Sequence, residues 1–232
     1  ADVNRDGKIN SLDALKILRI ATGLESGESD QTKQEAVDLY NSAINAAASA
    51  KKLTVIKTEK NNMSVEKVSS DNNSLKNILD RMLAEHTQPI TETKTFRKGV
   101  AIDLTKAVDF LPKAKLEPAG VKSAKVIKDD SGYSITIVTI EEKATLKNQT
   151  TKYTEQCAKP LDYSELDSAF NFQKLDLTYT GVTINAKIDK DGRLVSSSIE
   201  QPYLLDAEMS LSGSGMSMTL NCNWEQTIKC TY

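Results

Sequence analysis

The residues between Asp2 and Asp13 have side chains and a spacing suited to holding a metal ion. Asp2, Asn4 and Asp6 bring an oxygen to every second position, and Asp13 adds a carboxylate at the end of the segment. Calcium takes about six to eight oxygen ligands, so a short segment can supply most of them only by curling around the ion. Gly7 permits the sharp turn that this curl requires. The segment predicts a calcium-binding loop, and a polar turn without metal is the alternative.

Two further positions complete the predicted coordination shell. Lys8 stands where a calcium loop uses the backbone carbonyl rather than the side chain. Asn10 stands where the ligand acts directly or through a water molecule. Magnesium fits less well, because a flexible loop with this many protein ligands suits the larger ion. The metal ligands predicted from the loop are Asp2, Asn4, Asp6, Lys8 and Asp13.

A segment with helical periodicity follows the loop. In SLDALKILRIATGLE, Leu12, Leu15 and Leu18 recur at helical spacing, and Gly23 is placed as a C-terminal cap. An EF-hand would have another helix before its loop and usually a glutamate at the last loop position. A loop with one following helix, carried by the motif DVNRDGKINSLDAL, instead resembles one calcium-binding repeat of a type I dockerin over residues 1–24.

The resemblance implies a partner. Type I dockerins plug extracellular bacterial proteins into cohesin modules on a scaffoldin or a cell surface, as in cellulosome-type assemblies. The positions that contact the cohesin would be Ser11, Leu12, Leu18 and Arg19. Packing within the helix is the alternative role of the two leucines. The resemblance thus implies a secreted or cell-surface protein that binds calcium and a cohesin.

The resemblance covers one repeat, whereas a dockerin normally has two that pack against each other. Because the sequence begins at Ala1, immediately before the loop, we expect the other repeat to lie upstream or to have been removed. A lone helix of about a dozen residues is only marginally stable in water. The repeat should therefore pack on the rest of the chain or on a neighbour, or remain mobile.

Composition limits what the rest of the chain can be. The 232 residues leave room for one substantial domain beyond the repeat, and a net charge of −2 gives no basic field for nucleic acid. No apolar run approaches the roughly 18 residues of a membrane span, and no signal peptide is visible. Because a dockerin acts outside the cell, the resemblance implies a mature or trimmed form of an exported protein. The polar stretch LESGESDQ predicts a linker at 25–30, between the repeat at 1–24 and a domain at 31–232.

Periodicity in the larger domain predicts an α+β fold. Helical spacing runs through residues 31–51 and 73–85. Alternating patterns predict strands at 52–59, 64–69, 87–97, 121–128, 133–146, 175–188, 193–202 and from 204 onward, with turns at DDSG, DKDG and GSG. We expect a large, twisted antiparallel sheet covered by helices on one face. In element order alone, this resembles the half-barrel carriers of the lipoprotein-localisation type, which hold an apolar ligand between helices and sheet.

Catalytic patterns are missing from the sequence. His86 is the only histidine, and its place near a helix end favours capping. No P-loop, dinucleotide-binding glycine motif or nucleophile motif is found. The carboxylate pairs Asp129/Asp130 and Glu141/Glu142 fall at turns or strand ends, where solvated turns account for them. A glycosidase can use two carboxylates that are far apart in the sequence, and no local motif would identify them. The sequence therefore favours a protein that is not an enzyme, and a glycosidase stays an alternative.

Aromatic content argues against a sugar-degrading enzyme. Sugar rings stack on Trp and Tyr, and aromatic residues make up only 5% of the sequence. Trp224 lies in an alternating pattern and is expected in the core.

The three cysteines cannot all pair within one chain. A disulfide from Cys157 to Cys222 or Cys230 is favoured over the Cys222–Cys230 pair, which lies along one predicted strand. Buried free thiols are the alternative.

Three functions remain open. The first is a non-catalytic, exported protein tethered to a cohesin, whose larger domain binds or displays something. The second is a carrier or sensor of an apolar small molecule held between residues 31–51 and the sheet. The third is a small polysaccharide-active enzyme. A cavity beside the helix would favour the second, and facing carboxylates with aromatic flanks the third.

Overall fold

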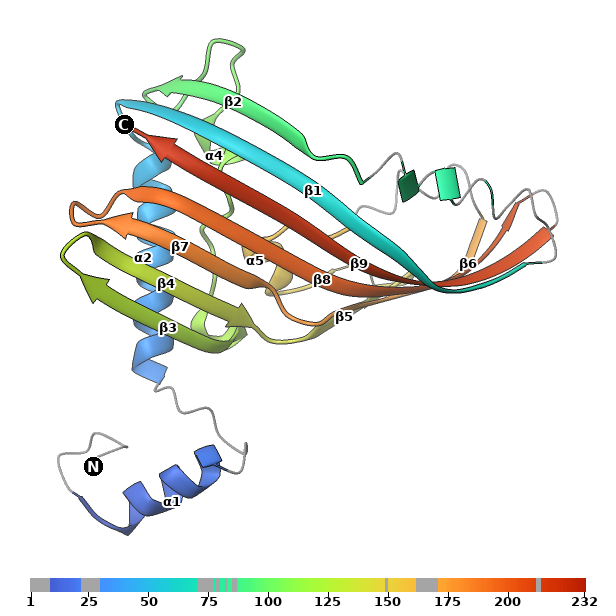
Figure 1. Cartoon of the computed structure of the whole chain (residues 1–232), viewed down its shortest axis with the longest axis horizontal. Helices are drawn as coiled ribbons and strands as arrows, with labels where there is room; N and C mark the ends of the chain where they lie inside the picture. The colour runs from blue at the N-terminus through green and yellow to red at the C-terminus, as the bar shows by residue number, and fades with distance from the viewer. Residues whose placement is uncertain are drawn as a thin grey trace.

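One large antiparallel sheet forms the body of the molecule (Figure 1). The computed structural model describes residues 9–21, 30–70, 77, 80–81, 83–84, 87–148, 150–161, 171–211 and 214–232. Its elements in chain order are α1 (Ser11–Ala21), α2 (Asp30–Ala48), β1 (Lys52–Ser69), β2 (Ile90–Arg97), α4 (Ala107–Phe110), η1 (Pro118–Gly120), β3 (Val121–Asp129), β4 (Gly132–Thr139), β5 (Glu142–Thr145), α5 (Thr154–Cys157), β6 (Asn171–Tyr179), β7 (Thr183–Asp189), β8 (Leu194–Leu211) and β9 (Ser214–Thr231). None of the described helices is long and apolar enough to cross a membrane.

Three long strands form the spine of the sheet. β1, β8 and β9 each run for 18 residues, and β9 pairs with the other two. The order β2-β1-β9-β8-β7-β4-β3 extends outward on both sides of this spine, while β6 pairs with β8 and β5. β8 pairs with β7 over 194–200 and with β6 over 203–210, so its two halves have different neighbours.

Helix α2 packs on one face of the sheet, against β3 and β4. Alanine is frequent on its inner side, and small side chains let a helix approach strands closely. The buried residues of α2 are Ala36, Val37, Tyr40, Ala43, Ile44 and Ala47. They join strand residues that include Leu53, Phe96, Ile137, Ile199 and Ile228 in a first apolar cluster.

A second apolar cluster lies farther along the long strands. Its members include Phe172, Tyr179, Tyr203, Met209, Met218, Leu220 and Cys222. Leu220 and Cys222 alternate along β9 with Trp224 and Ile228 of the first cluster. Because every second residue of a strand points to the same side, both clusters lie on one face of the sheet.

Much of the predicted organisation is confirmed. The large antiparallel sheet is present, the helix expected at 31–51 is α2, and the turns at DDSG and DKDG join β3 to β4 and β7 to β8. Of the turn expected at GSG, Gly213 lies outside the described residues and Ser214 and Gly215 belong to β9. The fold is mainly β. Helices were predicted to cover one face of the sheet, and among the described residues α2 packs on it. The helix predicted at 73–85 and His86 fall largely or wholly outside the described residues.

Several strand predictions were wrong. The strand expected at 133–146 is divided into β4 and β5, and the strands expected at 193–202 and from 204 onward begin as the single strand β8. The separate strands expected at 52–59 and 64–69 are one strand, β1, which continues through Asn61 and Asn62 because both pair with β9. The Nδ2 of Asn62 donates to Oε1 of Glu225 over 2.6 Å, so a residue pair typical of turns is held in the sheet. Conversely, the strand expected at 175–188 is broken into β6 and β7 around Gly181, whose φ of +111° suits a glycine.

All three cysteines are free thiols, which confirms the alternative to a disulfide between Cys157 and Cys222 or Cys230. Each is partly or fully buried, and loss of water around a thiolate disfavours the charged form. Burial therefore raises the pKa of Cys157 and Cys230 to about 12 and that of Cys222 to about 11.

We expect Ala43→Leu to lower the free energy of unfolding by about 1–3 kcal/mol, because Ala43 is 1% exposed and a larger side chain must displace the facing strand residues. Ala46→Leu is the matched control, since Ala46 lies on the exposed side of the same helix. Chemical denaturation of both variants provides the measurement. Equal stabilities would contradict the packing of α2 on the sheet.

We expect the thiols of the native protein to react slowly with Ellman's reagent at pH 8 and all three to react after denaturation without reductant, because burial keeps them protonated. A titre of one thiol would indicate a disulfide.

Since unfolded thiols deprotonate near pH 8.5, the unfolded state loses the cysteine protons before the folded state does as the pH rises. The free energy of unfolding should therefore fall as the pH rises from about 8.5, the pKa of an unfolded thiol. The fall should end once the pH passes the pKa of the folded thiols, about 11 for Cys222 and about 12 for Cys230.

Candidate functional site

Asp13, the predicted last ligand of the calcium loop, lies in the first turn of α1 and is only 2% exposed. Its Oδ2 accepts a hydrogen bond from the backbone N–H of Asn10 over 2.8 Å, and its own N–H donates to the Asn10 carbonyl over 3.2 Å. This reciprocal pair resembles one half of a capping box and fixes the carboxylate at the junction of loop and helix. A buried carboxylate at this junction fits a metal ligand set.

The other predicted ligands, Asp2, Asn4, Asp6 and Lys8, lie outside the described residues. Within the described part of the chain, no group of three or more His, Cys, Asp or Glu side chains could hold a metal ion. The coordination shell of the loop stays a prediction.

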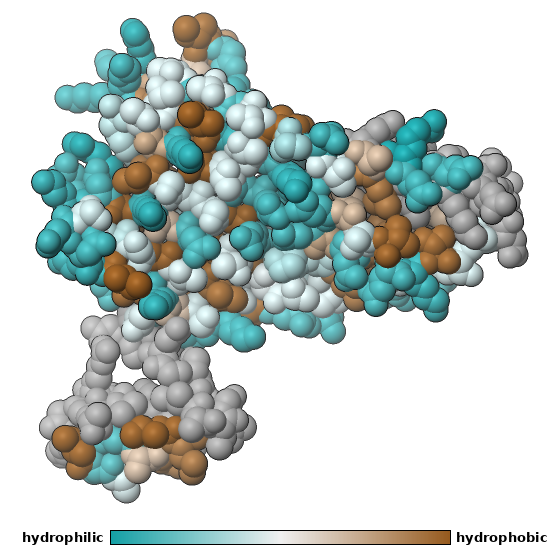
Figure 2. All heavy atoms as spheres, viewed as in Figure 1, coloured by the Kyte–Doolittle hydropathy of each residue, from teal (hydrophilic) through white to brown (hydrophobic). Residues whose placement is uncertain are grey.

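Apolar side chains of α1 are open to solvent. Leu15, Ile17 and Leu18 are 44%, 49% and 59% exposed, and Figure 2 shows apolar side chains over this helix. Ser11 is also exposed, whereas the side chains of Leu12 and Arg19 are not described. Of the predicted partner contacts, Ser11 and Leu18 are therefore accessible on one short helix.

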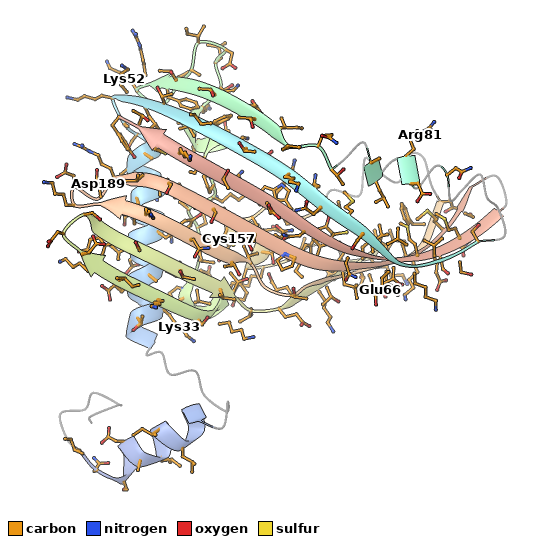
Figure 3. All side chains as sticks on the ribbon, viewed as in Figure 1. Lys33, Lys52, Glu66, Arg81, Cys157 and Asp189 are labelled. Carbon is orange, nitrogen blue, oxygen red and sulfur yellow. The ribbon has the colours of Figure 1, made fainter. Side chains whose placement is uncertain are left out.

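A second candidate site is a cavity of about 750 Å³ on the face of the sheet that α2 covers. Sequence analysis did not find it, because its lining comes from strands β1 and β9, helices α2, α4 and α5, and the segment after α4. These helices lie behind the strands in Figure 1, and Cys157, labelled in Figure 3, lines the cavity from α5. The strands contribute Lys57, Glu59, Trp224 and Gln226, which we call the cavity floor.

Hydrogen bonds and charges connect the cavity floor. Glu59 and Gln226 are directly paired across β1 and β9, and Gln226 Nε2 donates to Glu59 Oε1 over 2.8 Å. Lys57 Nζ lies 3.6 Å from the same carboxylate oxygen and 4.4 Å from the centre of the Phe110 ring. Trp224 is 8% exposed, which confirms its predicted place in the core, yet it also borders this cavity. The floor combines an ammonium, a carboxylate, an amide and aromatic surface.

Glu142 holds one wall of the cavity in place. Its carboxylate accepts hydrogen bonds from the backbone N–H groups of Lys152, Tyr153 and Thr154 and from the hydroxyl of Thr154, at 2.6–3.0 Å. The solvated-turn interpretation of Glu142 was therefore wrong. A carboxylate that takes the unpaired N–H groups at the start of α5 ties that short helix to β5. No local sequence signal links two segments ten residues apart in this way.

The cavity has little nucleophilic chemistry to offer. Cys157 is the cysteine that lines it, and burial raises its pKa to about 12, so the thiolate is scarce at neutral pH. The groups of the floor are suited to hydrogen bonding and ion pairing. The arrangement therefore favours binding.

Comparison with known proteins identifies the N-terminal segment. Residues 1–47 match the type I dockerin domain, which agrees with the resemblance drawn from DVNRDGKINSLDAL. The match ends within α2, the helix whose apolar side packs on the sheet. No curated protein and no solved structure matches the chain.

Proposed function

Because the N-terminal part of the chain is a type I dockerin, we propose that this is a non-catalytic, exported protein that attaches to a cohesin in a calcium-dependent way. The observation that carries the proposal is the dockerin match over residues 1–47. The exposed apolar side chains of α1 support it, because a partner surface would remove them from water. Dockerin-bearing proteins are typically extracellular or attached to the cell surface.

Calcium would be held by the carboxylates of Asp2, Asp6 and Asp13, the side chain of Asn4 and the carbonyl of Lys8. The ion would draw the loop together and fix it to the start of α1. Asp13 connects the loop to the helix, because it lies in the first turn of α1 and its carboxylate accepts a hydrogen bond from the Asn10 N–H. Loss of the ion would thus free the helix that carries the partner contacts.

The cohesin would contact Ser11, Leu12, Leu18 and Arg19 along α1. Residues four or seven apart on a helix share a face, so these side chains suit one partner surface. In this division, residues 1–24 are the docking repeat, 25–30 a linker and 31–232 the domain that is displayed.

A second role for residues 31–232 is ligand binding. The observation that favours it is the cavity between α2 and the sheet, whose volume of about 750 Å³ falls within the range of about 300–1,000 Å³ common for small-molecule sites. The tethered protein would then be a binding component held at a defined place.

We expect Asp13→Asn to weaken calcium binding by at least about tenfold, because the loop loses a negative charge at its closing ligand. Titration calorimetry of the full chain with calcium chloride gives the affinity. Asp130→Asn, in the exposed turn between β3 and β4, is the matched control and should bind as the parent does. An unchanged affinity in Asp13→Asn would contradict the assigned loop.

The full chain should bind one or more members of a panel of immobilised type I cohesins in calcium and lose that binding in EGTA. Leu18→Asp should weaken the interaction by about tenfold or more, because a charge would be buried against the partner. Ile102→Asp, on a fully exposed residue elsewhere, should leave binding unchanged. Binding that survives chelation, or no binding to any cohesin in calcium, would refute the proposal.

A further inference from the structure

The floor of the cavity beside α2 contains a buried acceptor, the side-chain carbonyl of Gln226. This residue is 7% exposed, and its Oε1 has no hydrogen-bond partner among the residues that the structure describes. Its amide nitrogen is committed to Glu59, because an ionised carboxylate can only accept and therefore faces the N–H side of the amide. A buried carbonyl without a donor is costly, so a ligand with a hydroxyl or N–H group would gain by supplying one.

The cavity lining is positive in a chain that is negative as a whole. Five lysines and three acidic residues line it, a net charge of +2, whereas the full chain carries −2. Lys57 is close to Glu59, and Lys152 lies 3.5 Å from Glu117. The exposed lysines Lys113, Lys115 and Lys159 form no ion pair with any residue that the structure describes. Asp109 and Glu155 also line the cavity and offset part of this charge, and the remaining net positive charge favours an anion over a cation.

The same features disfavour a purely apolar occupant. An aliphatic chain over the floor would strip water from Lys57, Glu59 and the Gln226 carbonyl without replacing its hydrogen bonds. The aromatic rings of Trp224, in the floor, and Phe110 still provide contact area for the carbon frame of a polar ligand.

We propose that this cavity binds a small organic anion that carries hydroxyl groups. A ligand hydroxyl donates to Gln226 Oε1, and the anionic group is held by the lysines at the mouth. Glu59 and Lys57 offer an acceptor and a donor to neighbouring hydroxyls. The lining comes from α2, β1, β9 and the segments around α4 and α5, and only Ile44 and Asn45 of α2 fall inside the dockerin match at 1–47.

The test is titration calorimetry of the full chain in EGTA, which removes any contribution from calcium docking. The probes are trigalacturonate, an acidic oligosaccharide, and D-gluconate, a free hydroxy acid; maltotriose lacks the charge and laurate lacks the hydroxyls. Binding of either hydroxylated anion, at least about tenfold tighter than maltotriose and laurate and weakened by salt, supports the proposal. Tighter binding of trigalacturonate would identify an acidic oligosaccharide as the ligand class, and tighter binding of D-gluconate a free hydroxy acid. No binding of either anion, or preferential binding of laurate or maltotriose, overturns it.

Variants separate binding from folding. Gln226→Met removes the unsatisfied carbonyl and also the amide donor to Glu59, while keeping the side-chain length. Affinity should fall at least about tenfold, and a cooperative melting curve verifies that the variant is folded. A role in structure alone would leave the affinity unchanged, which would overturn the assignment. Lys113→Ala should reduce both affinity and its salt dependence. Lys229→Ala, an exposed lysine of β9 that does not line the cavity, is the matched control and should change neither.

Discussion

The pairing of β9 with β1 on one side and β8 on the other is the constraint on which the rest of the structure depends. Each of the three strands runs for 18 residues, so the antiparallel register of one pair fixes which side chains share a face over nearly the whole sheet. A shift by one residue would move Trp224, Gln226 and Ile228 to the opposite face. The apolar clusters, the seat of α2 and the cavity floor all follow from that register.

The inner face of the sheet has polar groups inside its first apolar cluster, since Gln226 lies between Trp224 and Ile228 on β9. Lys57, Glu59 and Gln226 interrupt the apolar alternation of β1 and β9 and satisfy one another only in part. Three apolar residues would fill these positions at less electrostatic cost. These polar groups give the cavity its hydrogen-bonding character, and Glu142 fixes the α5 side of the cavity through its bonds to the start of that helix.

The two parts of the chain differ in how they encode function. In the dockerin segment the chemistry lies within consecutive residues, and the helix that follows keeps Leu15 and Leu18 open to solvent. In the sheet domain no short motif exists, because the chemistry is assembled across strands. The dockerin match and the cavity meet in α2, because the match ends at residue 47 and the lining includes Ile44 and Asn45.

The sequence alone determined what is local: the calcium-loop motif, the α2 helix and the hairpin turns at DDSG and DKDG, each set by the conformational preferences of neighbouring residues. It failed at Asn61 and Asn62, where pairing with β9 overrides a turn-like composition. Only the tertiary structure placed Glu59 against Gln226, 167 positions away, and Glu142 on the start of α5. Such contacts depend on strand register and packing, which propensity and spacing do not specify.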